Sequence, residues 1–209
     1  MNNMKTFKFL TALFVTSILT ACTMDAERPV NVQYIDKTDA TWQQHLQKIQ
    51  KIQSYQAKGQ IGYISPTERF SSRFEWQYQN PKSYTLKLYS LISKSTLWIQ
   101  MHQSGMTISD NNGNQQSAAN AKLLLQEIIG MDVPLEHLAY WLKGQPAMNA
   151  DYQVGINHLL GAFTYHVDGS QWTADYLTYH SNNSMPENIL LKNDSTKQTL
   201  KIRVDEWIY

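Results

Sequence analysis

The chain has 209 residues, of which 18 are Lys or Arg, 17 are Asp or Glu and one is Cys. This near-neutral balance argues against a nucleic acid partner, because nucleic-acid-binding surfaces need clustered positive charge. A single cysteine excludes a framework of intrachain disulfides and asks for another explanation. The length suits one domain with a sizeable core.

The first 21 residues are typical of an export signal. Lys5 and Lys8 form a basic start, and an uncharged, mostly apolar run covers residues 9–20. That run is shorter than the roughly 20 apolar residues that span a bilayer. We therefore predict a signal peptide over residues 1–21 and not a transmembrane helix. The run ends in Leu-Thr-Ala-Cys, which resembles the lipobox of bacterial lipoproteins.

This resemblance gives Cys22, the lone cysteine, a role, although an ordinary buried cysteine is the alternative. It implies cleavage before Cys22 and acylation with three chains, which would anchor the protein stably. Lipoproteins kept in the inner membrane carry Asp at the next position, so Thr23 implies the periplasmic face of the outer membrane. Residues 22–38 are polar and lack periodicity, and we expect them to be the lipidated N-terminus and a tether. A single domain would cover residues 39–209.

The expected domain begins with an amphipathic helix. Thr38 or Asp39 can cap it. Five apolar residues then recur at spacings of three and four, which places them on one helical face: Trp42, Leu46, Ile49, Ile52 and Tyr55. We expect this face to pack on the protein's own sheet, while a helix lying on a membrane surface is the alternative.

Strands follow, because apolar and polar residues alternate over three segments. The apolar positions are Phe74, Trp76 and Tyr78, then Tyr84, Leu86 and Leu88, then Leu97, Ile99 and Met101. Asn80 and Pro81 predict a turn between the first two segments, and residues 110–113 predict a hairpin turn. One apolar and one polar face indicate antiparallel strands with one side buried.

Two helices and further strands complete the pattern. We expect a helix over residues 119–129, presenting Leu123, Leu124, Ile128 and Ile129 and ending at Gly130. Pro134 can start a second helix. Its apolar residues are Leu135, Leu138, Trp141 and Leu142, and it ends before Gly144 and Pro146. Strands are predicted over residues 163–167, 172–178, 189–191 and 200–204, with a turn at Asp168 and Gly169.

The order of helix, strands, two helices and strands predicts an α+β fold with one curved antiparallel sheet. A curved sheet lined by aromatic and aliphatic side chains and closed by helices would enclose an apolar cavity suited to an apolar ligand. The pattern alone does not exclude a filled core, which is the simpler alternative.

Several segments resemble the LolB family of outer-membrane lipoprotein receptors. The most specific runs from Gly130 through Pro134, Leu135, Leu138, Trp141 and Leu142 to Gly144 and Pro146. Residues 42–45, 74–77, 84–88 and 200–207 also resemble family segments. The resemblance implies an incomplete antiparallel β-barrel with a helical lid that encloses an apolar cavity. It further implies a monomer that accepts lipoprotein cargo from the periplasmic carrier LolA and releases it into outer-membrane lipid, with acyl chains as its ligand and no cofactor.

The resemblance and the alternation together suggest which residues bind. We expect the acyl-chain cavity to be lined by Phe74, Trp76, Tyr84, Leu86, Leu88, Leu97, Ile99, Leu138, Trp141 and Leu142. The family commonly has Pro-Leu-Gly, with an exposed leucine, in a loop that inserts into the membrane. Here that loop reads Ser-Leu-Ile-Ser-Lys over residues 90–94, so Leu91 or Ile92 would form the tip. Both could instead fold back into the core, and the missing proline and glycine leave the geometry of the tip open.

Two other classes of protein compete with this reading. A lipoprotein enzyme would use His45, His158, His166 or His180 as a base, but no G-x-S-x-G, no H-E-x-x-H and no free thiol accompanies them, so we predict no catalytic or metal site. An assembly lipoprotein would bind outer-membrane proteins through a sheet edge. No G-x-x-x-x-G-K-[ST] run is present, which favours energy-independent transfer.

Overall fold

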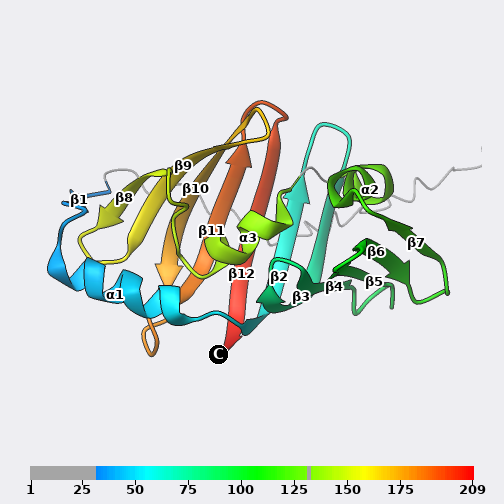
Figure 1. The fold of residues 1–209 in the computed structure, drawn as a ribbon, viewed down its shortest axis with the longest axis horizontal. Helices are drawn as coiled ribbons and strands as arrows, with labels where there is room; N and C mark the ends of the chain where they lie inside the picture. Colours follow the sequence, from blue (N-terminus) through cyan, green and yellow to red (C-terminus); the bar gives the residue numbers. More distant parts are fainter. Residues whose placement is uncertain (1–31, 131–132) are drawn as a thin grey trace, which may run out of the picture.

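The computed structural model describes residues 32–130 and 133–209, and it consists of one large antiparallel sheet with three helices on one face (Figure 1). The helices are α1 (Ala40–Lys51), α2 (Ala121–Ile129) and α3 (Leu135–Leu142). The strands are β1 (Tyr34–Ile35), β2 (Tyr55–Ile64), β3 (Arg69–Asn80), β4 (Ser83–Tyr89), β5 (Thr96–His102), β6 (Gly105–Asp110), β7 (Gln115–Ala118), β8 (Asp151–Gly155), β9 (Leu160–Val167), β10 (Ser170–Tyr179), β11 (Pro186–Asn193) and β12 (Gln198–Ile208).

The sheet is a curved and unclosed barrel. Its strands lie in the order β1-β8-β9-β10-β11-β12-β2-β3-β4-β5-β6-β7, and every neighbouring pair is antiparallel. In the described part of the chain β1 and β7 are the two ends of this order, so the barrel stays open. The predicted α+β fold with a half-open antiparallel barrel is therefore confirmed.

Helix α1 forms where the sequence indicates, but it ends earlier. The Asp39 carboxylate accepts a hydrogen bond from the Trp42 N–H at 2.8 Å and caps the helix. Trp42 and Ile49 are buried, so the helix packs on the protein's own sheet. The prediction that Tyr55 belongs to the same helical face is wrong, because the chain is extended from Ile52 onwards and Tyr55 begins β2.

Helices α2 and α3 cover the concave face. Gly130 ends α2 in the left-handed conformation at φ 69° and donates to the Gln126 carbonyl, as its position predicts. Helix α2 starts at Ala121 and buries Leu124 and Leu125. The prediction that Leu123 faces inward is wrong: it is 60 % exposed, because the helix turns the next two residues towards the core. The side chains of Ile128 and Ile129, predicted on the same face, lie outside what the structure describes.

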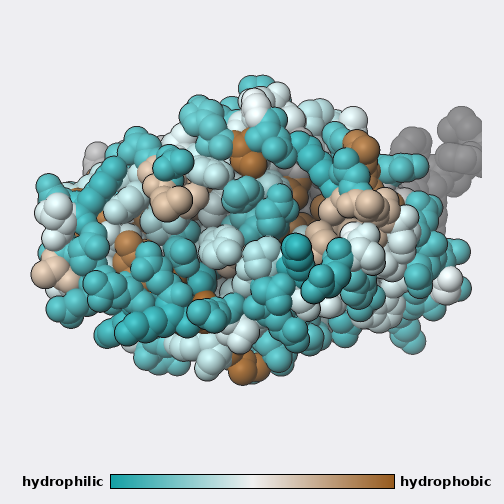
Figure 2. Space-filling view, in the orientation of Figure 1, coloured by the Kyte–Doolittle hydropathy of each residue, from teal (hydrophilic) through white to brown (hydrophobic). Residues whose placement is uncertain are grey.

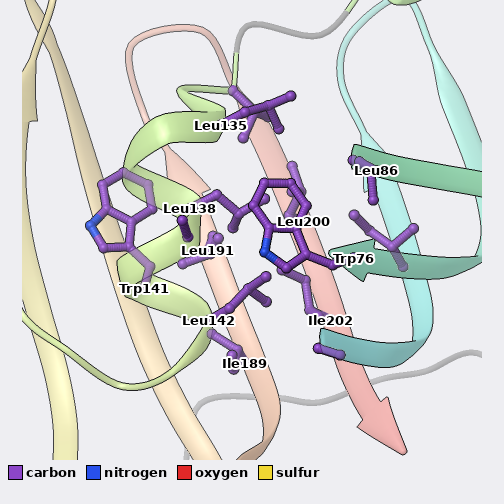
Figure 3. Packing of buried hydrophobic residues seen from close by; sticks show 14 of the residues in the cluster. Trp76, Leu86, Leu135, Leu138, Trp141, Leu142, Ile189, Leu191, Leu200 and Ile202 are labelled. Carbon is purple, nitrogen blue, oxygen red and sulfur yellow. The ribbon is translucent and has the colours of Figure 1, made fainter. Parts of the chain in front are cut away.

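The core lies between these helices and the sheet. Figure 3 shows the α3 side chains Leu138 and Leu142 facing residues of β11 and β12, among them Leu191 and Leu200. Burying each such side chain contributes about 1.5–3 kcal/mol. All these contacts lie within residues 32–130 and 133–209, so a chain that begins after Cys22 retains every contact described here.

Tyrosine hydroxyls from the sheet hold the helical cover in place. The hydroxyl of Tyr55 donates to the Ala139 carbonyl at 2.6 Å, that of Tyr176 to the Trp141 carbonyl at 2.6 Å, and that of Tyr63 to the Gly130 carbonyl at 3.0 Å. Burial raises the pKa of Tyr55 and of Tyr176 well above the ordinary value, so both remain donors at neutral pH. Buried carbonyls at the ends of the helices are thereby satisfied.

A buried lysine joins α3 to α1. Lys143 follows the last turn of α3 and is only 3 % exposed. Its ammonium donates to the Ile49 carbonyl in the last turn of α1 at 3.2 Å and to the carbonyl of the C-cap residue Ile52 at 2.7 Å. A cation at a helix C-terminus is electrostatically favourable, although burial costs hydration and lowers the pKa of Lys143 to about 8.

Candidate functional site

The residues expected to line an apolar cavity lie together on the concave side of the sheet and on α3. Nine of the ten are buried: Phe74, Trp76, Tyr84, Leu86, Leu88, Ile99, Leu138, Trp141 and Leu142. Leu97 is half-buried at the edge of the same cluster. Trp76, Leu86, Leu138 and Leu142 are among the cluster residues that Figure 3 shows between α3 and the sheet. The rings of Trp76 and Tyr84 stack with their centroids 5.2 Å apart. Among the ten, only Tyr84 also lines the largest cavity.

That cavity has a volume of about 660 Å³ and lies beside this cluster, under α2 and the start of α3. Ligand pockets commonly measure about 300–1,000 Å³. Its apolar walls come from the sheet and from the helical cover: Tyr84, Met101, Met106, Leu125, Val133 and Trp172. The alternation in the sequence marks Met101 and Trp172 as inward-facing. By contrast, no sequence pattern predicts that Met106, Leu125 and Val133 line the cavity, because their position depends on how the helices cover the sheet.

Charged side chains also line this cavity. The Lys122 ammonium on α2 lies 3.1 Å from a carboxylate oxygen of Asp168 in the turn between β9 and β10, and both side chains are about half exposed. Glu136 belongs to the first turn of α3 and also lines the cavity. Burial, with the charge of Glu136 as the second cause, raises the pKa of Tyr84 above its ordinary value. An apolar interior with these charged groups suits a ligand with apolar chains and a polar end.

The turn between β4 and β5 presents two aliphatic side chains. Leu91 is 72 % exposed and Ile92 is 97 % exposed. Backbone and side-chain hydrogen bonds close the turn, from the Ser90 N–H to the Ser95 carbonyl at 3.0 Å and from the Ser93 N–H to the Ser90 hydroxyl at 3.2 Å. Lys94 takes the left-handed conformation in this turn, with φ 54°. The structure thus places both aliphatic residues on the surface rather than in the core.

Other candidate residues do not form a site. The histidines are separate: Nδ1 of His158 lies 2.8 Å from the Asp39 carboxylate, and Nε2 of His180 lies 2.8 Å from the Val204 carbonyl. Within residues 32–130 and 133–209, no three His, Cys, Asp or Glu side chains gather as metal ligands would. Among the helices of this same part, none is long and apolar enough to cross a membrane. Cys22 and the expected signal peptide lie outside the described residues.

The visible face of the molecule is mostly hydrophilic, with apolar residues gathered over α2 (Figure 2). An unclosed barrel with a helical cover, a partly open cavity with apolar and charged walls, and an exposed aliphatic turn define the class of half-open antiparallel barrels. The comparisons with known proteins agree with this class.

The family model for the outer membrane lipoprotein LolB matches residues 53–207. The outer-membrane lipoprotein LolB of Haemophilus influenzae is 96 % identical over the whole of both chains, and that of Aggregatibacter actinomycetemcomitans is 62 % identical, also over the whole of both. This chain belongs to the LolB family of outer-membrane lipoproteins. A solved structure of a LolA superfamily protein from Nitrosomonas europaea shares 14 % identity and a TM-score of 0.49, over 81 % of this chain and 93 % of that one, a likeness too remote to carry an argument.

Proposed function

We propose that this outer-membrane lipoprotein accepts lipoproteins from a LolA-like periplasmic carrier and passes them to the membrane by energy-independent transfer of their acyl chains. The observation that carries the proposal is the apolar cavity of about 660 Å³ under α2 and α3, in a barrel that is open at its edges. The buried cluster beside it is the second part of the acyl-chain site. Entering acyl chains can move its packed side chains aside and so enlarge the cavity.

The free-energy cost of exposing acyl chains to water makes such a cavity necessary. A triacyl anchor has about 45 methylenes, and at about 0.8 kcal/mol each its full exposure to water would cost on the order of 36 kcal/mol. Passage through water is therefore excluded, and the chains must move from one apolar cavity directly into the next. The direction of transfer needs only a small difference in affinity, since about 1.4 kcal/mol changes an equilibrium tenfold.

Release into the membrane is assigned to the turn between β4 and β5. Leu91 and Ile92 are the aliphatic residues that this turn exposes, and insertion into a bilayer would bury both. The same turn would bring the open barrel to the membrane surface, while acylation of Cys22 would keep the protein attached to it.

A transfer assay tests the proposal. The soluble chain 23–209 is mixed with the matching carrier loaded with a labelled lipoprotein, in the absence of nucleotide. We expect the label to move onto this protein and, when liposomes are added, into the lipid. The double variant Leu91→Glu and Ile92→Glu should accept the label but deliver it poorly. Ile156→Glu, which changes an equally aliphatic residue that is 60 % exposed in the β8–β9 turn, is the matched control and should deliver normally. A requirement for ATP, or no movement onto the folded wild-type chain, would refute the proposal.

The structure gives the alternative, binding of outer-membrane proteins through a sheet edge, little support. The edge strands of the described sheet are β1, with two residues, and β7, with four. Strand addition derives its affinity from a row of main-chain hydrogen bonds, and edges this short offer few.

A further inference from the structure

One buried hydroxyl beside the cavity differs from the other tyrosine hydroxyls of the core. Tyr55, Tyr63 and Tyr176 each donate to a carbonyl of the helical cover. The hydroxyl of Tyr84 is also closed off from water, yet it finds no hydrogen-bond partner in the described part of the chain. Tyr84 is only 3 % exposed. A buried donor without a partner costs about 1–3 kcal/mol, and in a native protein it asks for an explanation.

The position of this hydroxyl suggests that it donates a hydrogen bond to a ligand. The Tyr84 side chain lines the cavity, and its ring is fixed by stacking on Trp76. Glu136 is another residue of the cavity wall, so the cavity brings a carboxylate to the same lining as the Tyr84 ring. At neutral pH the hydroxyl is protonated and offers one donor at a fixed place in an apolar wall. A ligand that brings an acceptor to this place removes the cost of the unpartnered group.

We infer that the cavity selects acyl chains by a neutral carbonyl at their head, which accepts a hydrogen bond from the Tyr84 hydroxyl, while the Glu136 carboxylate repels chains that end in an anion. This inference rests on the proposed function, because it assumes that acyl chains enter the cavity. The carbonyl reaches the hydroxyl when the entering chain parts the side chains that now close over it. Chains joined through an ester or an amide are thereby favoured over plain alkyl chains and over fatty-acid anions.

The charges around the cavity support the second half of the inference. Lys122 lies in an ion pair with Asp168, so these two charges compensate each other. Glu136 is exposed, lines the same cavity and forms none of the ion pairs found within the described residues. The lining therefore presents the exposed carboxylate of Glu136, and a like charge on the ligand is unfavourable there.

Three ligands of equal chain length separate these effects: monolauroylglycerol, the ether dodecylglycerol, which lacks the carbonyl, and laurate. Binding to the chain 23–209 is measured by calorimetry at neutral pH and below the concentrations at which the ligands aggregate. The wild-type protein should bind the ester about two- to tenfold more tightly than the ether, the range expected for one neutral hydrogen bond. Laurate should bind more weakly than the ester.

Two variants test which side chain causes each of these binding preferences. Tyr84→Phe keeps the stacked ring and should bind ester and ether equally, whereas Glu136→Gln should strengthen only the binding of laurate. Equal binding of ester and ether by the wild-type protein, or an ester preference that survives in Tyr84→Phe, would overturn the inference and leave the proposed function standing. If the wild-type protein bound none of the three ligands, the proposed function itself would fail. Thermal unfolding of each variant checks the fold, and the wild-type comparison decides even if Tyr84→Phe does not fold.

Discussion

The buried Lys143 makes the free energy of unfolding increase as the pH rises above neutral. Its folded-state pKa is lowered from 10.5 to about 8 because burial removes hydration from the ammonium. Between these two values the unfolded chain binds a proton that the folded chain lacks. The free energy of unfolding therefore rises with pH in this window, by about 1.4 kcal/mol per pH unit. Between pH 8 and pH 9, before the unfolded tyrosines ionise, the increase is about 1 kcal/mol.

Between pH 9 and pH 10 the sign reverses. The pKa values of the buried Tyr55, Tyr176 and Tyr179 are raised well above 10.0, so the stability that their neutral forms contribute is lost as the unfolded tyrosines begin to ionise. We expect maximal stability between pH 9 and pH 10, and urea unfolding of the chain 23–209 at closely spaced pH values measures it.

The variant Lys143→Met isolates this effect. It removes a buried charge, which is favourable, but leaves the carbonyls of Ile49 and Ile52 without that donor, so its stability at neutral pH should differ little from the wild type. The rise between pH 8 and pH 9 should disappear. A wild-type stability that is flat or falling over this range, or a rise that persists in Lys143→Met, would refute the assignment.

Three further predictions concern the turn, the cavity and the sheet. Replacing both Leu91 and Ile92 by Ser should weaken binding of the soluble chain to liposomes about a hundredfold, because burying side chains this exposed contributes about 3 kcal/mol in total, whereas Ile156→Ser should have little effect in the same flotation assay. Ala121→Trp places a large ring at the cavity and should lower acyl-chain affinity at least about tenfold by calorimetry, with a thermal midpoint close to that of the wild type. Gly59→Ala should destabilise the protein by more than about 2 kcal/mol in urea unfolding, because a Cβ there would lie 1.9 Å from a backbone oxygen, whereas Gly62→Ala, with its nearest neighbour at 3.9 Å, should cost less than about 1 kcal/mol.

Local signals sufficed for much of the fold. The capping residue Asp39, the left-handed Gly130 and the turn at Asp168 and Gly169 were predictable because each depends on a few neighbouring residues. Strand β2 was missed, since its alternating buried positions include Ala57 and Gly59, whose small side chains give a weak pattern. Strand β1 was missed because two residues carry no pattern, and only pairing with β8 extends them.

The site was predictable in part. Alternation identified which side chains of β3, β4 and β5 face inward, and these are buried except for Leu97 and Met101 of β5, which are half-buried. It did not show where the interior is empty. That depends on Leu125 and Val133 in the cover and on Trp172 from the far half of the sheet, which approach Tyr84 only through the curvature of the whole sheet. Such long-range geometry has no local sequence signal.

The connection between β7 and β8 gives the cover a mechanical role. It carries α2 and α3, and it joins an edge strand at one end of the sheet to the strand next to the edge at the other end. The helical cover is thus attached to the sheet at both of its ends. A change in the curvature of the sheet would alter the distance between these two attachment points, and the position of α2 and α3 would change with it.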